Sequence, residues 1–219
     1  MRATPTLDFA IGRFPVRVHW SFLLIALLIG LNVNNLLSTL TWVVVVFVSV
    51  LVHELGHAVM AERYGLFPSI QLHSMGGLTI YSRVRRLTHL QEILLSLAGP
   101  FFGFALGGVV FALTKFLPLG VVPGFLIVML SQLLWVNIGW GVINLIPMLP
   151  LDGGQVMRNL WLWLRNPYDE RTPLIISIVI GILAACAGLW LRSIWLAGLA
   201  AWFTYNNFIR LQGGRPAMY

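Results

Sequence analysis

The chain has 219 residues, of which 58% are hydrophobic and only 10% are charged, and its formal net charge is +7. Soluble domains average about 25% charged residues, so this composition excludes an ordinary soluble domain and favours a protein that is solvated by lipid. The single cysteine, Cys186, excludes a disulfide framework within the chain and a cysteine-based metal site.

Six apolar segments have about the length that a helix needs to cross ~30 Å of hydrocarbon at ~1.5 Å per residue. They cover residues 18–36, 40–61, 93–116, 122–146, 174–191 and 194–209. We interpret the first as a retained span, because polar Asn32, Asn34 and Asn35 follow it where a signal peptide would carry a small-residue cleavage site. The prediction is an all-α polytopic membrane protein with about six transmembrane helices, in which residues 1–219 form a single domain.

The basic residues predict the orientation of these spans. If the N-terminus is inside, the cytoplasmic segments hold 12 of the 14 Lys and Arg residues, and only Lys115 and Arg192 lie outside. Cytoplasmic loops carry an excess of Lys and Arg. We therefore expect both termini in the cytoplasm, and the positive charge requires no nucleic acid as a partner.

The segment 65–82, after the second apolar segment, is too short and too interrupted to cross a membrane. Apolar residues alternate with polar ones on both sides of Gly76 and Gly77, which predicts two short strands. A sheet edge near lipid must be covered or line a cavity. We therefore predict a small membrane-associated β-hairpin whose edge could receive another strand; an ordinary cytoplasmic loop is an equally compatible alternative.

His53, Glu54 and His57 form an H-E-x-x-H pattern near the inner end of the second apolar segment. On a helix, residues i and i+4 lie on one face, so both imidazoles can reach one metal ion, and neutral imidazole is a good zinc ligand. Ionisable residues inside a span are costly and usually functional. We predict one Zn²⁺ per chain on His53 and His57, with Glu54 as the general base.

A catalytic zinc usually has three protein ligands, and Asp152 is the preferred third. It follows the fourth apolar segment, whose inner end lies on the same side of the membrane as His53 and His57 in the predicted topology. His19 and His73 are rival ligands. An Asp among Pro and Gly residues also fits a plain turn.

The sequence His53-Glu54-Leu55-Gly56-His57, together with Asn144-Leu-Ile-Pro147 and Leu151-Asp152-Gly153, resembles the site-2 protease family of intramembrane zinc metalloproteases. Weaker similarities are residues 18–22, 76–77 and 98–100, and the resemblance extends from about residue 13 to residue 155. It implies that His53, His57 and Asp152 bind zinc, that Glu54 is the general base, and that Asn144, Gly76 and Gly77 help to hold the substrate or its oxyanion.

The resemblance also implies the reaction, which is hydrolysis of peptide bonds in or near transmembrane segments in regulated intramembrane proteolysis or signal-peptide clearance. The expected partners are membrane lipid and a membrane-protein or signal-peptide substrate, with a homo-oligomer left open, and the expected location is a bacterial cytoplasmic membrane. The chain departs from the family at Gly103, where members commonly carry Asn, and it matches a minimal form without a PDZ or nucleotide-sensing domain.

Three rival functions remain at this stage. A di-iron oxidase or desaturase needs several histidine clusters, and the chain has one. A zinc carrier or sensor needs ligands but no base such as Glu54 beside them. The third rival is a catalytically inactive scaffold, which the intact motif disfavours.

Overall fold

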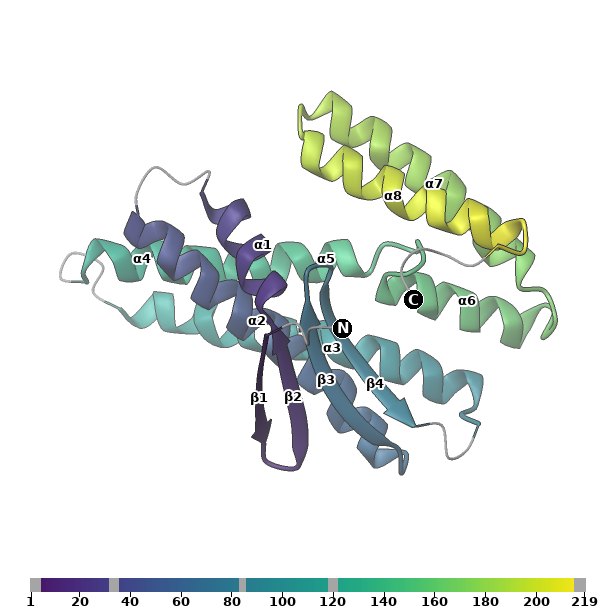
Figure 1. Cartoon of the computed structure of the whole chain (residues 1–219), viewed down its shortest axis with the longest axis horizontal. Helices are drawn as coiled ribbons and strands as arrows, with labels where there is room; N and C mark the ends of the chain where they lie inside the picture. The colour runs from purple at the N-terminus through teal and green to yellow at the C-terminus, as the bar shows by residue number, and fades with distance from the viewer. Residues whose placement is uncertain (1–4, 32–35, 83–85, 118–121, 215–219) are drawn as a thin grey trace. The chain divides into compact units, whose positions relative to one another are not determined.

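The structure is a computed structural model that describes residues 5–31, 36–82, 86–117 and 122–214 (Figure 1). The chain forms two compact units. The first comprises Met1–Arg86 and Ala98–Ile143, and the second comprises Leu87–Leu97 and Asn144–Tyr219.

The first unit contains a four-stranded sheet with the strand order β1-β2-β3-β4 (Figure 1). β1 (Thr6–Ile11) and β2 (Phe14–His19) form an antiparallel hairpin, and β2 pairs in parallel with β3 (Phe67–His73). β3 pairs antiparallel with β4 (Gly76–Ser82). The two strands expected after the second helix are therefore present, but they belong to a larger sheet, and the turn between them precedes Gly76 instead of containing it.

The N-terminal strands correct the interpretation of residues 18–36 as one span. Val18 and His19 end β2, and the helix that follows, α1 (Trp20–Gly30), has 11 residues, or about 17 Å. In β2, Phe14, Val16 and Val18 are buried and alternate with more exposed residues. Because an apolar helix follows this strand directly, a search for long apolar runs merges the two.

α2 (Leu36–Arg63) is a 28-residue helix that packs against β3 and β4. Leu51 and Ala58 of α2 share a buried cluster with Val16, Ile70 and Leu72 of the sheet. Fully burying an aliphatic side chain contributes about 1.5–3 kcal/mol relative to exposure. This packing fixes the sheet against the part of α2 that carries the H-E-x-x-H motif.

Two further helical segments follow the sheet. α3 (His89–Phe116) also has 28 residues, and a second run consists of α4 (Gly124–Leu134), the π-helical turn η1 (Trp135–Trp140) and α5 (Gly141–Asn144). Buried Asn137 of η1 donates through its amide to the hydroxyl of Ser49 on α2 at 2.9 Å and to the carbonyl of Leu133 at 2.9 Å. π-helical turns are rare and often lie at functional sites. The bond from η1 reaches α2 at Ser49, one helical turn before His53 of the motif.

The second unit contains α6 (Asp152–Leu164), α7 (Arg171–Trp190) and α8 (Ile194–Leu211). α7 and α8 lie side by side as a helical hairpin (Figure 1). They hold the loop before α6, because buried Asn207 donates to the carbonyl of Leu149 at 2.6 Å and the Leu149 amide donates to buried Ser177 at 3.1 Å. Both backbone polar groups of Leu149 are thus satisfied by the last two helices.

Four of the described helical segments are long and apolar enough to cross a membrane: α2, α3, the run Gly124–Asn144 and α7. The expected six spans are not confirmed, because α1 is short and α8 interrupts its apolar sequence with Thr204, Asn206 and Asn207. Residues 32–35 and four of the counted arginines, Arg2, Arg83, Arg85 and Arg215, lie outside the described part. The predicted orientation therefore stays a prediction.

Candidate metal centre and active site

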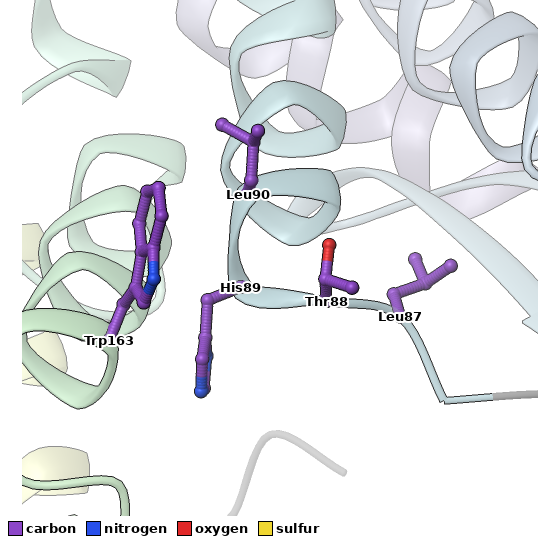
Figure 2. A pocket seen from close by; sticks show the side chains of 5 residues that line it. All are labelled: Leu87, Thr88, His89, Leu90 and Trp163. Atoms are coloured by element: carbon purple, nitrogen blue, oxygen red, sulfur yellow. The ribbon is translucent and has the colours of Figure 1, made fainter.

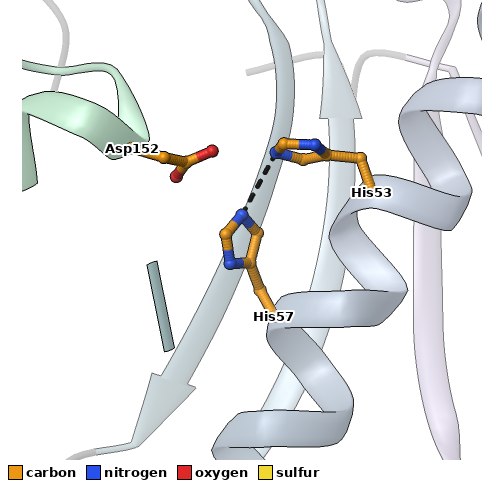
Figure 3. Close-up of side chains that lie close together, drawn as sticks. All are labelled: His53, His57 and Asp152. Carbon is orange, nitrogen blue, oxygen red and sulfur yellow. Dashed lines mark hydrogen bonds between the residues drawn. The ribbon is translucent and has the colours of Figure 1, made fainter. Parts of the chain in front are cut away.

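α2 brings the two motif histidines together (Figure 3). The Nε2 atoms of His53 and His57 are 3.2 Å apart, and the rings meet edge to face at 78°. Two nitrogens bound to one tetrahedral zinc at ~2.0–2.1 Å would lie about 3.3 Å apart. The pair therefore has the separation that a shared zinc ion requires.

Glycines on α2 and α3 leave room for these rings. A Cβ at Gly99 would overlap the His57 imidazole and lie 2.7 Å from Nε2 of His53. A Cβ at Gly56, inside the motif, would collide with the carbonyl oxygen of Ala98. α2 and α3 thus cross closely beside the two histidines. A side chain larger than glycine at either position would fill this space.

Glu54 is buried, with 6% of its surface exposed, and it lies against β4. Its Oε2 accepts a hydrogen bond from the Thr79 hydroxyl at 2.7 Å. A Cβ at Gly77 would lie 2.5 Å from Cγ and Oε1 of Glu54, whereas Gly76 has a φ of +118° and open space around its Cβ position. Gly77 therefore gives room to the expected base, and Gly76, directly after the turn, has a positive φ that favours glycine.

The rival ligands His19 and His73 end the neighbouring strands β2 and β3. The Nδ1 atom of His73 accepts from the amide of Met75 at 3.2 Å. Burial, and then the charge of His19, lower the pKa of His73. Neither histidine belongs to a group of described residues whose side-chain atoms could share one metal ion.

In the second unit, Asp152 is the first residue of α6 and is half-buried (Figure 3). The two glycines after it are needed for packing: a Cβ at Gly153 would overlap the carbonyl of Leu145, and a Cβ at Gly154 would overlap the backbone between residues 148 and 149. The chain therefore folds tightly back on the preceding loop and presents Asp152 at the helix start. Asn144 ends α5 and is also half-buried.

An open hollow of about 490 Å³ lies elsewhere in the second unit (Figure 2). It is lined by Leu87, Thr88, His89, Leu90 and Trp163. Its one titratable side chain is His89, whose Nδ1 lies 3.4 Å from the amide oxygen of Asn159. Among the described lining residues, His89 therefore stands beside one hydroxyl, that of Thr88, and three apolar side chains.

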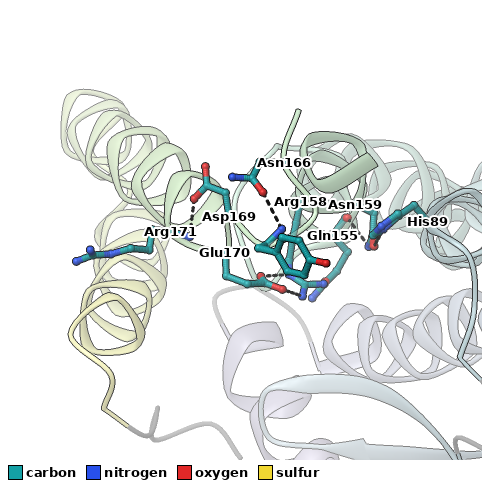
Figure 4. A network of polar contacts seen from close by, with 9 residues as sticks. His89, Gln155, Arg158, Asn159, Asn166, Asp169, Glu170 and Arg171 are labelled. Carbon is teal, nitrogen blue, oxygen red and sulfur yellow. Dashed lines mark hydrogen bonds and ion pairs between the residues drawn. The ribbon is translucent and has the colours of Figure 1, made fainter. Parts of the chain in front are cut away.

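A polar network joins α6 to the start of α7 (Figure 4). The Asp169 carboxylate accepts from the hydroxyl of Thr172 at 2.6 Å, from two backbone amides, and from the Trp161 indole at 3.0 Å. The hydrogen bonds from Thr172 lower the pKa of Asp169. Arg158 of α6 pairs with Glu170 beside it. These contacts hold the two helices together and explain the two acidic residues without a catalytic role.

Comparison with known proteins identifies the class. A family model described as peptidase family M50 matches residues 120–187. The solved site-2 protease from Methanocaldococcus jannaschii superposes with a TM-score of 0.65 and 25% sequence identity, over 94% of this chain and 95% of that one.

Curated relatives agree with this class. The chain is 33% identical to the zinc metalloprotease MJ0392 of Methanocaldococcus jannaschii over 155 residues, which are 68% of this chain and 43% of that protein. It is 30% identical to the putative zinc metalloprotease Rip3 of Mycobacterium tuberculosis over 220 residues, covering 89% of this chain and 55% of that protein. The chain thus spans about half the length of these relatives.

The comparisons agree on one class of protein: the chain is similar to the site-2 proteases and zinc metalloproteases of peptidase family M50. The resemblance stated from the sequence motifs is confirmed. Sequence reasoning missed Thr79, whose only signal was a hydroxyl at an inward position of a strand, and it noted Gly99 only within the weak family similarity of residues 98–100 without linking it to the histidines.

Proposed function

We propose that the chain is an intramembrane zinc metalloprotease that cleaves peptide bonds in or near transmembrane segments of membrane-anchored proteins. The observation that carries this proposal is the 3.2 Å separation of the His53 and His57 Nε2 atoms beside buried Glu54, on a helix apolar enough to span a membrane. A zinc carrier would need the two histidines but not the carboxylate.

Asp152 is the proposed third ligand of a single Zn²⁺ ion. His53 and His57 each offer one imidazole nitrogen and Asp152 offers a carboxylate oxygen, and this donor set leaves one position of a tetrahedral zinc open. Asp152 is supported by its place in the family motif and by the tight Gly153-Gly154 turn that holds it at the start of α6.

Zinc, Glu54 and Asn144 would each contribute one part of the hydrolysis. Bound zinc would supply Lewis acidity towards a peptide carbonyl and a water molecule. Glu54 would take a proton from the attacking water and deliver it to the leaving amine. The side-chain amide of Asn144 would donate a hydrogen bond to the developing oxyanion.

A substrate helix hides its carbonyls in its own hydrogen bonds and must unwind before it can be attacked. β4 is the last strand in the sheet order, so an unwound segment could add to its edge by main-chain hydrogen bonds.

The proposed substrates are membrane proteins or leftover signal peptides. The proposed setting is a bacterial cytoplasmic membrane with both chain termini inside.

The test is to purify the wild type, Glu54→Gln and Asp152→Ala in detergent and to measure bound zinc and cleavage of a single-span model substrate. We expect about one zinc per chain and cleavage in the wild type only, because Glu54→Gln keeps the ligands and loses the base. Asp152→Ala should hold less zinc. Equal activity of Glu54→Gln and the wild type would contradict the mechanism.

A further inference from the structure

Thr79 is a half-buried hydroxyl on the face of β4 that packs against α2. It pairs with Ile70 in the sheet register, as Gly77 pairs with Leu72, and both Ile70 and Leu72 are 0% exposed. Leu78 and Ile80 point to the opposite, exposed face. A hydroxyl on an apolar inner face is costly unless a hydrogen bond satisfies it.

That hydrogen bond goes to Glu54. The Thr79 Oγ1 atom is 2.7 Å from Oε2 of the Glu54 carboxylate and 3.1 Å from the backbone carbonyl oxygen of the same residue. A hydroxyl has one proton to donate, and bonds to an ionised carboxylate are the shorter and stronger ones. The 2.7 Å bond therefore fixes the orientation of the carboxylate.

Gly77 acts on the other side of the same carboxylate. Because a Cβ at Gly77 would lie 2.5 Å from both Cγ and Oε1 of Glu54, only glycine leaves the side chain in its present place. β4 thus holds Oε2 with a hydroxyl and leaves space around Oε1. One strand determines where the carboxylate lies.

We propose that Thr79 is a positioning residue for the general base Glu54: its hydroxyl holds Oε2 so that Oε1 is the oxygen that exchanges the proton. The inference rests on the proposed function. Because β4 is also the edge strand to which an unwound substrate would add, one strand sets the place of the base relative to the bond to be cleaved. Thr79 itself does not contact the reacting atoms.

The test compares Thr79→Val, which keeps the shape and loses the hydroxyl, with Thr79→Ser, which keeps the hydroxyl. The matched control is Ser69→Ala, which removes a hydroxyl of the neighbouring strand that lies 3.5 Å from the carbonyl of Ile80. The readouts are bound zinc, the melting temperature, and kcat and KM for a fluorescently labelled single-span peptide with a Gly-Pro pair in its apolar segment.

We expect Thr79→Val to lower kcat by about tenfold to 100-fold, with KM, zinc content and melting temperature unchanged, because a misplaced catalytic group loses rate and not binding. Thr79→Ser and Ser69→Ala should behave as the wild type. A loss of zinc or of melting temperature in step with kcat would show a structural role and overturn the proposal.

Infrared spectroscopy gives a readout that needs no substrate. The chain has four glutamates, Glu54, Glu62, Glu92 and Glu170, so carboxyl-¹³C glutamate labelling with Glu54→Gln as the reference isolates the Glu54 band. Thr79→Val should shift this band, and Thr79→Ser should not. An unshifted band in Thr79→Val, or in Thr79→Ala if the valine variant does not fold, would overturn the proposal.

A zinc-loaded wild type that cleaves nothing would contradict the proposed function. The infrared result would then decide on Thr79.

Discussion

The side chains of the candidate site fit into space that neighbouring glycine residues leave free. Gly56 and Gly99 let α2 and α3 approach at the histidines, and Gly77 makes room for Glu54. The motif residues could be predicted from the sequence, because H-E-x-x-H on a helix has a direct chemical meaning. The glycines could not be interpreted before the fold was known, because their role lies in contacts between elements far apart in the sequence.

Gly99→Ala tests the close crossing of α2 and α3 at the histidines. The new Cβ would overlap the His57 imidazole and displace it from His53, so we expect zinc affinity to fall by at least about tenfold, since ligand geometry is lost. The measurement is zinc competition with a chelating dye.

The matched control for Gly99→Ala is Gly108→Ala, on the same helix, where a Cβ meets nothing within 4 Å. This control should bind zinc as the wild type does. Equal zinc affinity of the two variants would show that the α2–α3 crossing does not shape the metal centre.

At the scale of elements, the long apolar helices were predictable and the strands before them were not. The expected segments 93–116, 174–191 and 194–209 correspond to α3, α7 and α8 to within a few residues. β1 and β2 were missed because the alternation of Phe14, Val16 and Val18 runs directly into the apolar sequence of α1. The π-helical turn η1 has no signal of its own, since its bond from Asn137 to Ser49 links residues 88 positions apart.

α7 and α8 carry no motif, and their contacts suggest a supporting role for the loop before Asp152. Asn207→Leu removes the donor to the Leu149 carbonyl and leaves a buried acceptor unsatisfied, at a cost of about 1–3 kcal/mol. We expect a lower melting temperature in detergent. Thr204→Val, which loses only a bond to Ala200 within α8, is the control, and equal melting temperatures of the two variants would contradict the supporting role.

The stability of the second unit should depend on pH in the acid range, because of the Asp169 carboxylate before α7. Hydrogen bonds from Thr172 hold the pKa of Asp169 below its ordinary value of 3.8, so the carboxylate stabilises the fold above that pH, and the stabilisation is lost as pH falls through the lowered pKa. The melting temperature of Asp169→Asn should therefore differ from that of the wild type at about pH 6, and the difference should shrink towards about pH 3. A difference that stays constant over this range would exclude the carboxylate as its cause.

At the scale of the whole molecule, composition alone indicated the membrane, and the paired motifs indicated the family. The resemblance agrees with the matches to peptidase family M50 and to a solved site-2 protease. The number of membrane spans was less predictable. An apolar segment can be a strand followed by a short helix, or a helix whose polar residues form hydrogen bonds within the protein. A single domain over residues 1–219 and the inside location of both termini stay predictions.

The central claim is that zinc and Glu54 together cleave a peptide bond, and metal removal tests it most directly. Wild type in proteoliposomes is stripped with a chelator and reloaded with Zn²⁺, and cleavage of a co-reconstituted single-span substrate is followed beside Glu54→Gln treated in the same way. The account predicts that the stripped wild type is inactive, that one equivalent of Zn²⁺ restores cleavage, and that Glu54→Gln rebinds zinc and stays inactive. Cleavage that persists without zinc, or that returns in Glu54→Gln, would contradict it.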